Sequence, residues 1–83
     1  MAQYGLGYAL EISGKPTEAI KSFEDSLKSA ETGLKGDTML AIARNHELAN
    51  NSAAAKATYD KILTDLPNSE YSRTAEVLRA KLQ

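Results

Sequence analysis

The sequence predicts an all-α fold made of two antiparallel helix hairpins and a single closing helix. Three observations lead to this prediction. Apolar residues recur at helical spacing along the whole chain, and no stretch alternates apolar and polar residues as a half-buried strand does. Breaks containing glycine, proline or asparagine divide the chain into five helical segments joined by short turns. Residues 36 positions apart match, as Ala19 and Ala55 do.

Length, charge and composition limit the classes of function. With 83 residues the chain has room for one domain. The formal net charge is −1 and the 10 basic residues are spread along the chain, which argues against nucleic-acid binding. The chain has no cysteine and no apolar run that approaches the ~20 residues of a membrane span. Because the sequence opens in a helical pattern and stops soon after one, we expect a fragment of a longer protein.

The first hairpin is predicted from two amphipathic segments around the break SGKP. The first helix runs from about Ala2 to Ser13, with Tyr4, Leu6, Ala9 and Leu10 among its apolar residues. Gly14 suits the left-handed conformation that ends a helix, and Pro16 suits the first turn of the next one. That second helix runs to about Thr32, and its apolar stripe consists of Ala19, Ile20, Phe23 and Leu27.

The second hairpin and the closing helix follow the predicted turn TGLKGD. Asp37 or Thr38 is expected to cap the third helix, which extends to the break Asn50-Asn51 and carries Met39, Ile42, Ala43 and Leu48. Ser52 is expected to cap the fourth helix, with Ala55, Tyr59, Ile62, Leu63 and Leu66 facing inward, and Pro67 stops it. The fifth helix starts at about Ser69 and carries Tyr71, Ala75, Leu78 and Leu82.

The matching positions of the two hairpins resemble the tetratricopeptide repeat (TPR), whose pattern is W-x₂-L-G-x₂-Y…A-x₃-F…P over about 34 residues. Both copies here lack the tryptophan and its tyrosine partner. The resemblance implies an α/α superhelix, a TPR-like solenoid, with repeat one over about 1–35, repeat two over about 36–69 and a capping helix over about 70–83. The positions that carry it are Leu6, Gly7, Gly14, Ala19, Phe23, Ile42, Ala43, Ala55, Tyr59 and Pro67.

Gly7 stands inside the first predicted helix, where a glycine costs about 1 kcal/mol relative to alanine. A phosphate-binding G-x-G-x-x-G loop does not explain it, because Leu10 stands at the third glycine and no strand precedes Gly5. The remaining explanation is a close approach of two helices, with the small Ala19 on the facing helix and Phe23 filling the space beyond. We therefore expect Gly7 to be a packing residue.

The segment 59–82, YDKILTDLPNSEYSRTAEVLRAKL, resembles the closing segment of bacterial cell-envelope TPR proteins, in which Tyr-x-x-Ile/Leu…Pro-Asn/Asp-Ser precedes a solitary terminal helix. The resemblance implies that the fifth helix shields the apolar face of the second hairpin. It also implies a location in the bacterial periplasm or cell envelope, although a cytoplasmic location stays open. The polar side of this helix is predicted to consist of Arg73, Glu76, Arg79 and Lys81.

No catalytic constellation emerges from the sequence. His46 is the single histidine, and HELAN begins like the zinc-protease motif H-E-x-x-H, but Asn50 stands where the second histidine is needed. The carboxylates Glu11, Glu24 and Asp25 are interpreted as parts of solvated helix faces. We therefore predict a non-catalytic protein that uses no cofactor and no metal.

The function that remains is binding. In a stack of helix pairs the first helix of each pair lines the concave wall. We therefore expect a protein–protein interaction module that binds a peptide or helix of a partner, and neither nucleic acid nor a small-molecule substrate. By the resemblance the concave wall consists of Tyr4, Tyr8, Glu11 and Ile12 from the first pair and Asp37, Leu40, Arg44, Glu47 and Leu48 from the second.

A structural role is the alternative. The chain is then the end of a solenoid or an oligomerisation segment within a larger envelope assembly, and a homo-oligomer is one such arrangement. In this interpretation Tyr4 and Tyr8 pack against a preceding repeat, because about three repeats are needed for a stable stack.

Overall fold

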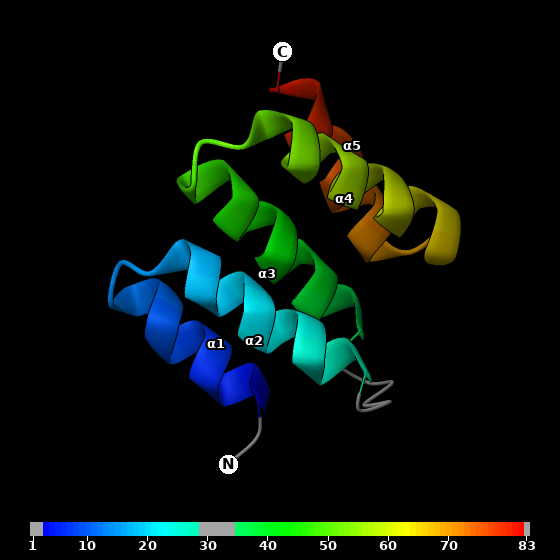
Figure 1. Cartoon of the computed structure of the whole chain (residues 1–83). Helices are drawn as coiled ribbons and strands as arrows, with labels where there is room; N and C mark the ends of the chain where they lie inside the picture. The colour runs from blue at the N-terminus through cyan, green and yellow to red at the C-terminus, as the bar shows by residue number, and fades with distance from the viewer. Residues whose placement is uncertain (1–2, 29–34, 83) are drawn as a thin grey trace.

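The computed structural model describes residues 3–28 and 35–82, with the backbone alone for Gln3 and Tyr4. This part of the chain forms five α-helices and no strand. Consecutive helices run antiparallel and each packs against the next (Figure 1), while α3 also touches α5. The described chain is therefore all-helical, as predicted. The helices are α1 (Gln3–Ile12), α2 (Pro16–Lys28), α3 (Lys35–Leu48), α4 (Ser52–Asp65) and α5 (Glu70–Ala80).

The helices form a flat slab, with Cα extents of 32 × 28 × 15 Å, and the core is divided between two clusters. One cluster joins α2 and α3 through Ala19, Ile20, Phe23, Ala41 and Ile42. The other joins α3, α4 and α5 through Met39, Ala43, Ala55, Tyr59, Ile62 and Ala75. α3 contributes to both clusters, so both of its sides are buried and it joins the two halves of the fold.

Gly7 lies where α1 packs against Phe23 of α2. A Cβ atom built on Gly7 lies 2.7–2.8 Å from three atoms of the Phe23 ring, well inside van der Waals contact. Phe23 and Ala19 are both fully buried. A Cβ on Gly5 meets nothing within 4 Å. The structure therefore shows the close approach expected at Gly7, and it places Gly5 in open space.

Several equivalent residues of the two hairpins occupy equivalent environments. Gly14 after α1 has φ 78° and Asn50 after α3 has φ 61°, so both helices end in the left-handed conformation. Ala55 is fully buried in α4 as Ala19 is in α2. Tyr59, in the same way, is buried at the position that corresponds to Phe23. At these positions the 36-residue correspondence in the sequence is therefore also a correspondence in packing.

The start of α3 differs from the prediction. Neither Asp37 nor Thr38 caps it, because the helix already begins at Lys35. Gly36 is buried in its first turn, where a Cβ would lie 2.5 Å from the Tyr71 ring. The missing side chain lets Tyr71 of α5 pack on this turn. The predicted turn TGLKGD is therefore wrong in its second half, because residues 35–37 belong to α3. Its first half, residues 32–34, and the predicted end of the second helix at Thr32 lie outside the described residues.

The cap of α4 also differs from the prediction. Asn51, and not Ser52, is the N-cap, because the Asn51 side chain accepts a hydrogen bond from the Ala54 backbone N–H at 3.2 Å. Pro67 follows the end of α4 as expected. Ser69 caps α5 through reciprocal hydrogen bonds with Ser72, 3.1 Å and 3.0 Å long.

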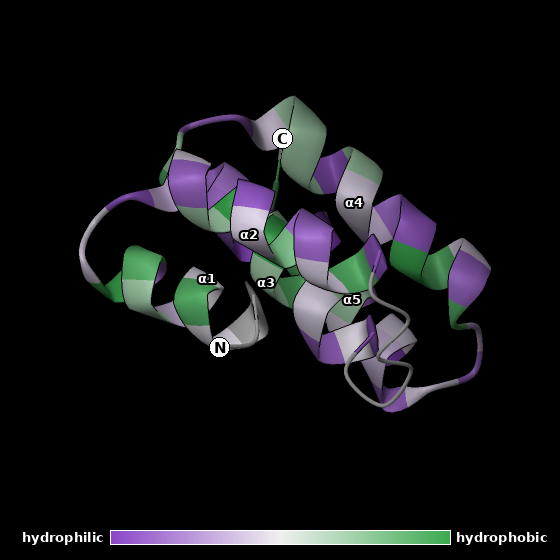
Figure 2. Cartoon of the chain, turned by 60° about the horizontal axis from the view of Figure 1, so that its bottom comes forward, coloured by the Kyte–Doolittle hydropathy of each residue, from purple (hydrophilic) through white to green (hydrophobic). Residues whose placement is uncertain are grey.

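The outer side of α1 is less buried than its apolar sequence indicates. Leu6 is 38% exposed and Ala9 is exposed, although both belong to the predicted apolar set. Figure 2 shows α1 in mostly green and pale colours, at one end of the helix array. Among the described helices only α2 packs extensively against α1, so no described helix covers the other side.

Candidate functional site

An ion pair joins α1 and α3, which are the first helices of the two hairpins. The Arg44 Nε and Nη2 atoms donate to the two carboxylate oxygens of Glu11, both at 2.6 Å. The Asn45 Nδ2 atom donates to the same carboxylate at 3.2 Å and to the Ala41 carbonyl at 2.8 Å. Bidentate pairs of this kind fix orientation as well as distance. Glu11 and Arg44 therefore lock the two helices in one register.

The ion pair shifts the pKa values of both partners. The hydrogen bond from Arg44 lowers the pKa of Glu11 below 4.5; partial burial opposes this shift and the Asn45 hydrogen bond supports it. The pKa of Arg44 is raised, mainly by its hydrogen bond to Glu11. Both groups are thus charged at neutral pH, and their charges cancel within the pair.

Tyr8 is held between this ion pair and the core. The Arg44 guanidinium carbon lies 5.6 Å from the centroid of the Tyr8 ring, within the range of a cation–π contact. On its other side, the Tyr8 ring meets Phe23 edge to face, with 5.1 Å between ring centroids and 84° between planes. Tyr8 is therefore a fixed ring, half-buried on the surface that α1 and α3 share.

Two large apolar side chains flank this fixed ring. Ile12 is 85% exposed and Leu48 is 55% exposed, and they occupy equivalent positions at the ends of α1 and α3. Ile12 follows Tyr8 by four residues, and Leu48 follows Arg44 by four, so each pair shares one helix face. We call these four residues, Tyr8 and Ile12 on one face of α1 and Arg44 and Leu48 on one face of α3, the α1–α3 patch.

The other residues of the predicted concave wall are used within the fold. Glu47 accepts a hydrogen bond of 2.5 Å from the Tyr59 hydroxyl of α4, and burial followed by this hydrogen bond raises the pKa of Tyr59. Leu40 is half-buried against the core. The Asp37 carboxylate accepts a hydrogen bond of 3.4 Å from Tyr71, whose pKa it raises electrostatically. The side chain of Tyr4 lies outside the described residues.

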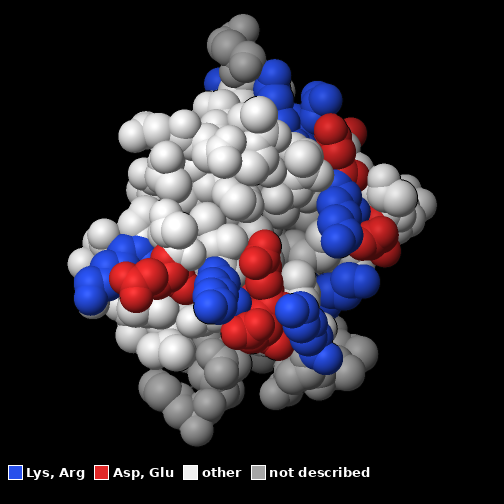
Figure 3. Space-filling view, viewed as in Figure 1, with Lys and Arg blue, Asp and Glu red and all other residues white. Residues whose placement is uncertain are grey.

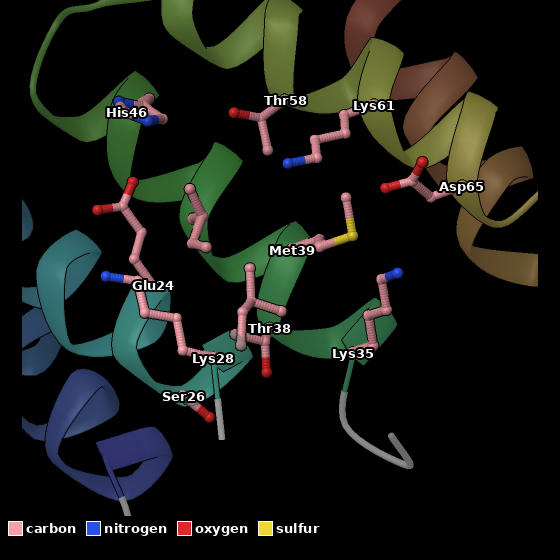
Figure 4. A pocket seen from close by; sticks show the side chains of 12 residues that line it. Glu24, Ser26, Lys28, Lys35, Thr38, Met39, His46, Thr58, Lys61 and Asp65 are labelled. Carbon is pink, nitrogen blue, oxygen red and sulfur yellow. The ribbon is translucent and has the colours of Figure 1, made fainter. Parts of the chain in front are cut away.

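A groove between α2 and α4 is a second feature of the surface, which the sequence analysis missed. It has a volume of about 630 Å³ and is lined by Ile42 and Met39 of α3, and Figure 4 shows Met39 there. Three lysines on three different helices border it together with two acidic residues. No sequence signal marks this groove, because its border residues are scattered from α2 to α4. They include Glu24, Lys28, Lys35, Lys61 and Asp65.

Charges of both signs alternate across the side of the molecule that Figure 3 shows. The groove on this side has no single-sign field that would select a strongly charged ligand. His46 also borders the groove, and Thr58 faces it from α4. Within residues 3–28 and 35–82, no three His, Cys, Asp or Glu side chains lie close enough together to hold a metal ion.

No helix among the described residues has the length and apolar character needed to cross a membrane. Comparison of this chain with protein-family models, with curated proteins and with solved structures finds no match.

Proposed function

We propose that the chain is a TPR-like protein-interaction module whose partner binds the α1–α3 patch. Three features of the fold support the TPR-like part of this proposal. The two hairpins share their left-handed helix ends and their buried Ala and aromatic positions. α3 packs between α2 and α4, so one hairpin stacks on the next. α5 closes the second hairpin, with Arg73 and Glu76 exposed on its outer side.

The observation that carries the binding proposal is the exposure of Ile12 and Leu48 beside a rigid Tyr8–Arg44 stack. Burial of large apolar side chains in an interface favours binding by roughly 25 cal/mol for each Å² of apolar surface removed from water. Here they surround an aromatic ring and an arginine, which are the residue types enriched at binding hot spots. Because the Glu11 ion pair already fixes Arg44, little side-chain entropy remains to be lost when a partner binds.

The same ion pair defines the chemistry of the partner. The charge of Arg44 is compensated by Glu11 at 2.6 Å, so the α1–α3 patch offers mainly apolar and aromatic surface. A matching peptide or helix presents apolar side chains and does not depend on a carboxylate. Binding should therefore weaken little between low and physiological salt, unlike binding through exposed charges.

Selection of peptides from a display library on the intact chain tests the proposal. The selected peptides are titrated against the chain and against the variants Ile12→Asp and Leu48→Asp. Val77→Asp is the matched control, because Val77 is an exposed apolar residue, 59% accessible, on α5. We expect affinity to fall about tenfold or more for the two patch variants and to stay unchanged for the control.

Two results would contradict the proposal. One is a set of selected peptides whose affinity drops for Val77→Asp as much as for Ile12→Asp. The other is a failure to select any peptide that competes for the α1–α3 patch. Circular dichroism of each variant shows whether the helices remain intact, so that loss of folding is not mistaken for loss of binding.

A structural role is the second candidate, and the exposed apolar side of α1 favours it. Leu6 is 38% exposed at the free side of the helix array. In this role the chain is one end of a solenoid or an oligomerisation segment in a larger envelope assembly. Analytical ultracentrifugation distinguishes self-association from a monomer that binds peptides.

A further inference from the structure

The outer face of α1, which we define by Gly5, Leu6 and Ala9, corresponds in sequence to a face of α3 that the fold buries. The positions 36 residues later are Ala41, Ile42 and Asn45 of α3, which are 0%, 5% and 0% exposed. Gly5, Leu6 and Ala9 are all exposed. The same register therefore gives a covered face in one hairpin and an open face in the other.

The helix that covers the face of α3 shows what kind of surface fits there. α2 packs on α3, and its Ile20 and Phe23 join Ala41 and Ile42 in one cluster. Leu27 packs against the same cluster from one turn further along α2. These three side chains follow the spacing i, i+3, i+7, which places them along one side of a helix.

The outer face of α1 is suited to a closer and less polar contact than its counterpart. Ala9 replaces Asn45, so the polar group that bonds to Glu11 in α3 has no equivalent here. Gly5 has no side chain, and a Cβ there would meet nothing within 4 Å. Leu6 is left as the one large side chain beside two small ones, an arrangement that lets another helix approach closely.

We propose that the outer face of α1 binds an amphipathic helix that carries large apolar side chains at i, i+3 and i+7, in the arrangement that α2 adopts on α3. The partner is uncharged along this stripe, because the face of α1 offers no charge to pair with. The proposal uses no residue of the α1–α3 patch, so it can fail or hold independently of the proposed function.

A second copy of the chain does not supply such a stripe from its described helices. α2 lies between α1 and α3, and α4 lies between α3 and α5, so the apolar stripes of both are already used. The exposed side of α5 and its C-cap carries Arg73, Glu76 and Lys81, with Val77 as its single large apolar side chain. α1 of a second copy would bring Leu6 as its single large side chain on this face.

The test uses a synthetic helix with the sequence of α2, PTEAIKSFEDSLK, as the probe. A lactam between the side chains at Lys21 and Asp25 holds it helical, because a free peptide of this length is only marginally helical in water. These two positions lie on the opposite side from Ile20, Phe23 and Leu27. The labelled peptide is titrated against the intact chain by fluorescence anisotropy. A control peptide carries serine at the three stripe positions.

The protein variants are Leu6→Asp and, as the matched control, Val77→Asp. We expect the α2 peptide to bind the wild-type chain and Val77→Asp equally, and Leu6→Asp about tenfold more weakly. The serine peptide should not bind. Leu6 is already partly exposed, so Leu6→Asp should leave the helical content unchanged, which circular dichroism checks.

Three results overturn the proposal. The first is equal affinity of the peptide for Leu6→Asp and the wild type, which places the peptide elsewhere. The second is no saturable binding of the α2 peptide to the wild type. The third is a concentration-dependent dimer that Leu6→Asp dissociates in ultracentrifugation, which assigns the outer face of α1 to a second copy of the chain.

Discussion

Replacing Gly7 by alanine is the sharpest test of the packing between α1 and α2. Alanine adds a single methyl group, which would lie 2.7–2.8 Å from three atoms of the Phe23 ring. This is about 0.6–0.7 Å short of the 3.4 Å at which ordinary contact begins. Phe23 is fully buried and Tyr8 packs against its ring at 5.1 Å between centroids, so the ring has little room to move.

The expected magnitude follows from two opposing effects. Overpacking a close-packed core costs about 1–3 kcal/mol. Alanine is a better helix former than glycine by about 1 kcal/mol, which offsets part of this cost. Gly7→Ala should therefore lower the free energy of unfolding by about 0–2 kcal/mol. Gly5→Ala meets open space and should raise it by up to about 1 kcal/mol.

The measurement is urea unfolding of both variants, followed by circular dichroism. Both substitutions gain about the same helix propensity, so the difference between their free energies of unfolding isolates the cost of overpacking. We expect this difference to be about 1–3 kcal/mol. In thermal unfolding this corresponds to at least about 4 °C for a domain of this size. A second substitution, Phe23→Leu, should relieve the clash, so the double variant should be less destabilised than the sum of its single changes. If Gly7→Ala proves as stabilising as Gly5→Ala, the close approach at Gly7 is refuted.

The remaining predictions concern other contacts. Glu11→Gln should lower the free energy of unfolding by about 1 kcal/mol at neutral pH, because the pair with Arg44 is partly exposed. Because the pKa of Glu11 is lowered in the folded state, this stability is present above pH 4.5 and is lost as the pH falls through the folded-state pKa. In urea titrations at different pH values, Glu11→Gln should lack this part of the acid dependence. An acid dependence identical to that of the wild type would refute the ion pair. Gly36→Ala should destabilise by up to about 2 kcal/mol, because the gain in helix propensity offsets about 1 kcal/mol of the clash with Tyr71, and a stability raised by about 1 kcal/mol would argue against that contact. Asn51→Ala should cost about 1 kcal/mol through loss of the cap, while Ser52→Ala should cost almost nothing; the reverse order in urea unfolding would restore Ser52 as the cap.

The sequence predicts the helices well because their signals are local. The stripe of Ala19, Ile20 and Phe23 is buried in α2, as its helical spacing indicates. Gly14 carries a positive φ after α1, which glycine adopts more readily than other residues. The packing role of Gly7 is also predictable from local sequence, because a glycine inside a helical pattern is unfavourable and therefore indicates a close contact.

Features that depend on distant contacts are not predictable in this way. Glu11 and Arg44 are 33 residues apart, and periodicity places each on a helix without revealing that they bond to each other. Gly36 belongs to a stretch with typical turn composition, yet it is helical and packs against Tyr71, which is 35 residues away in the sequence. The exposure of Leu6 depends on which helices surround α1 and not on its own sequence. These contacts decide which residues of the predicted wall are open to a partner.

The measurement that tests the central claim most directly is photo-crosslinking of the protein in its native cell. Photoreactive residues replace Ile12 and Leu48 in the α1–α3 patch, and Val77 and Lys21 as exposed controls on other helices. Ile12 and Leu48 are preferred over Tyr8 and Arg44, because the latter two are engaged in contacts within the fold. The account predicts that both patch probes capture the same protein and that the controls do not. Capture by Val77 and Lys21 with silent patch probes would contradict it.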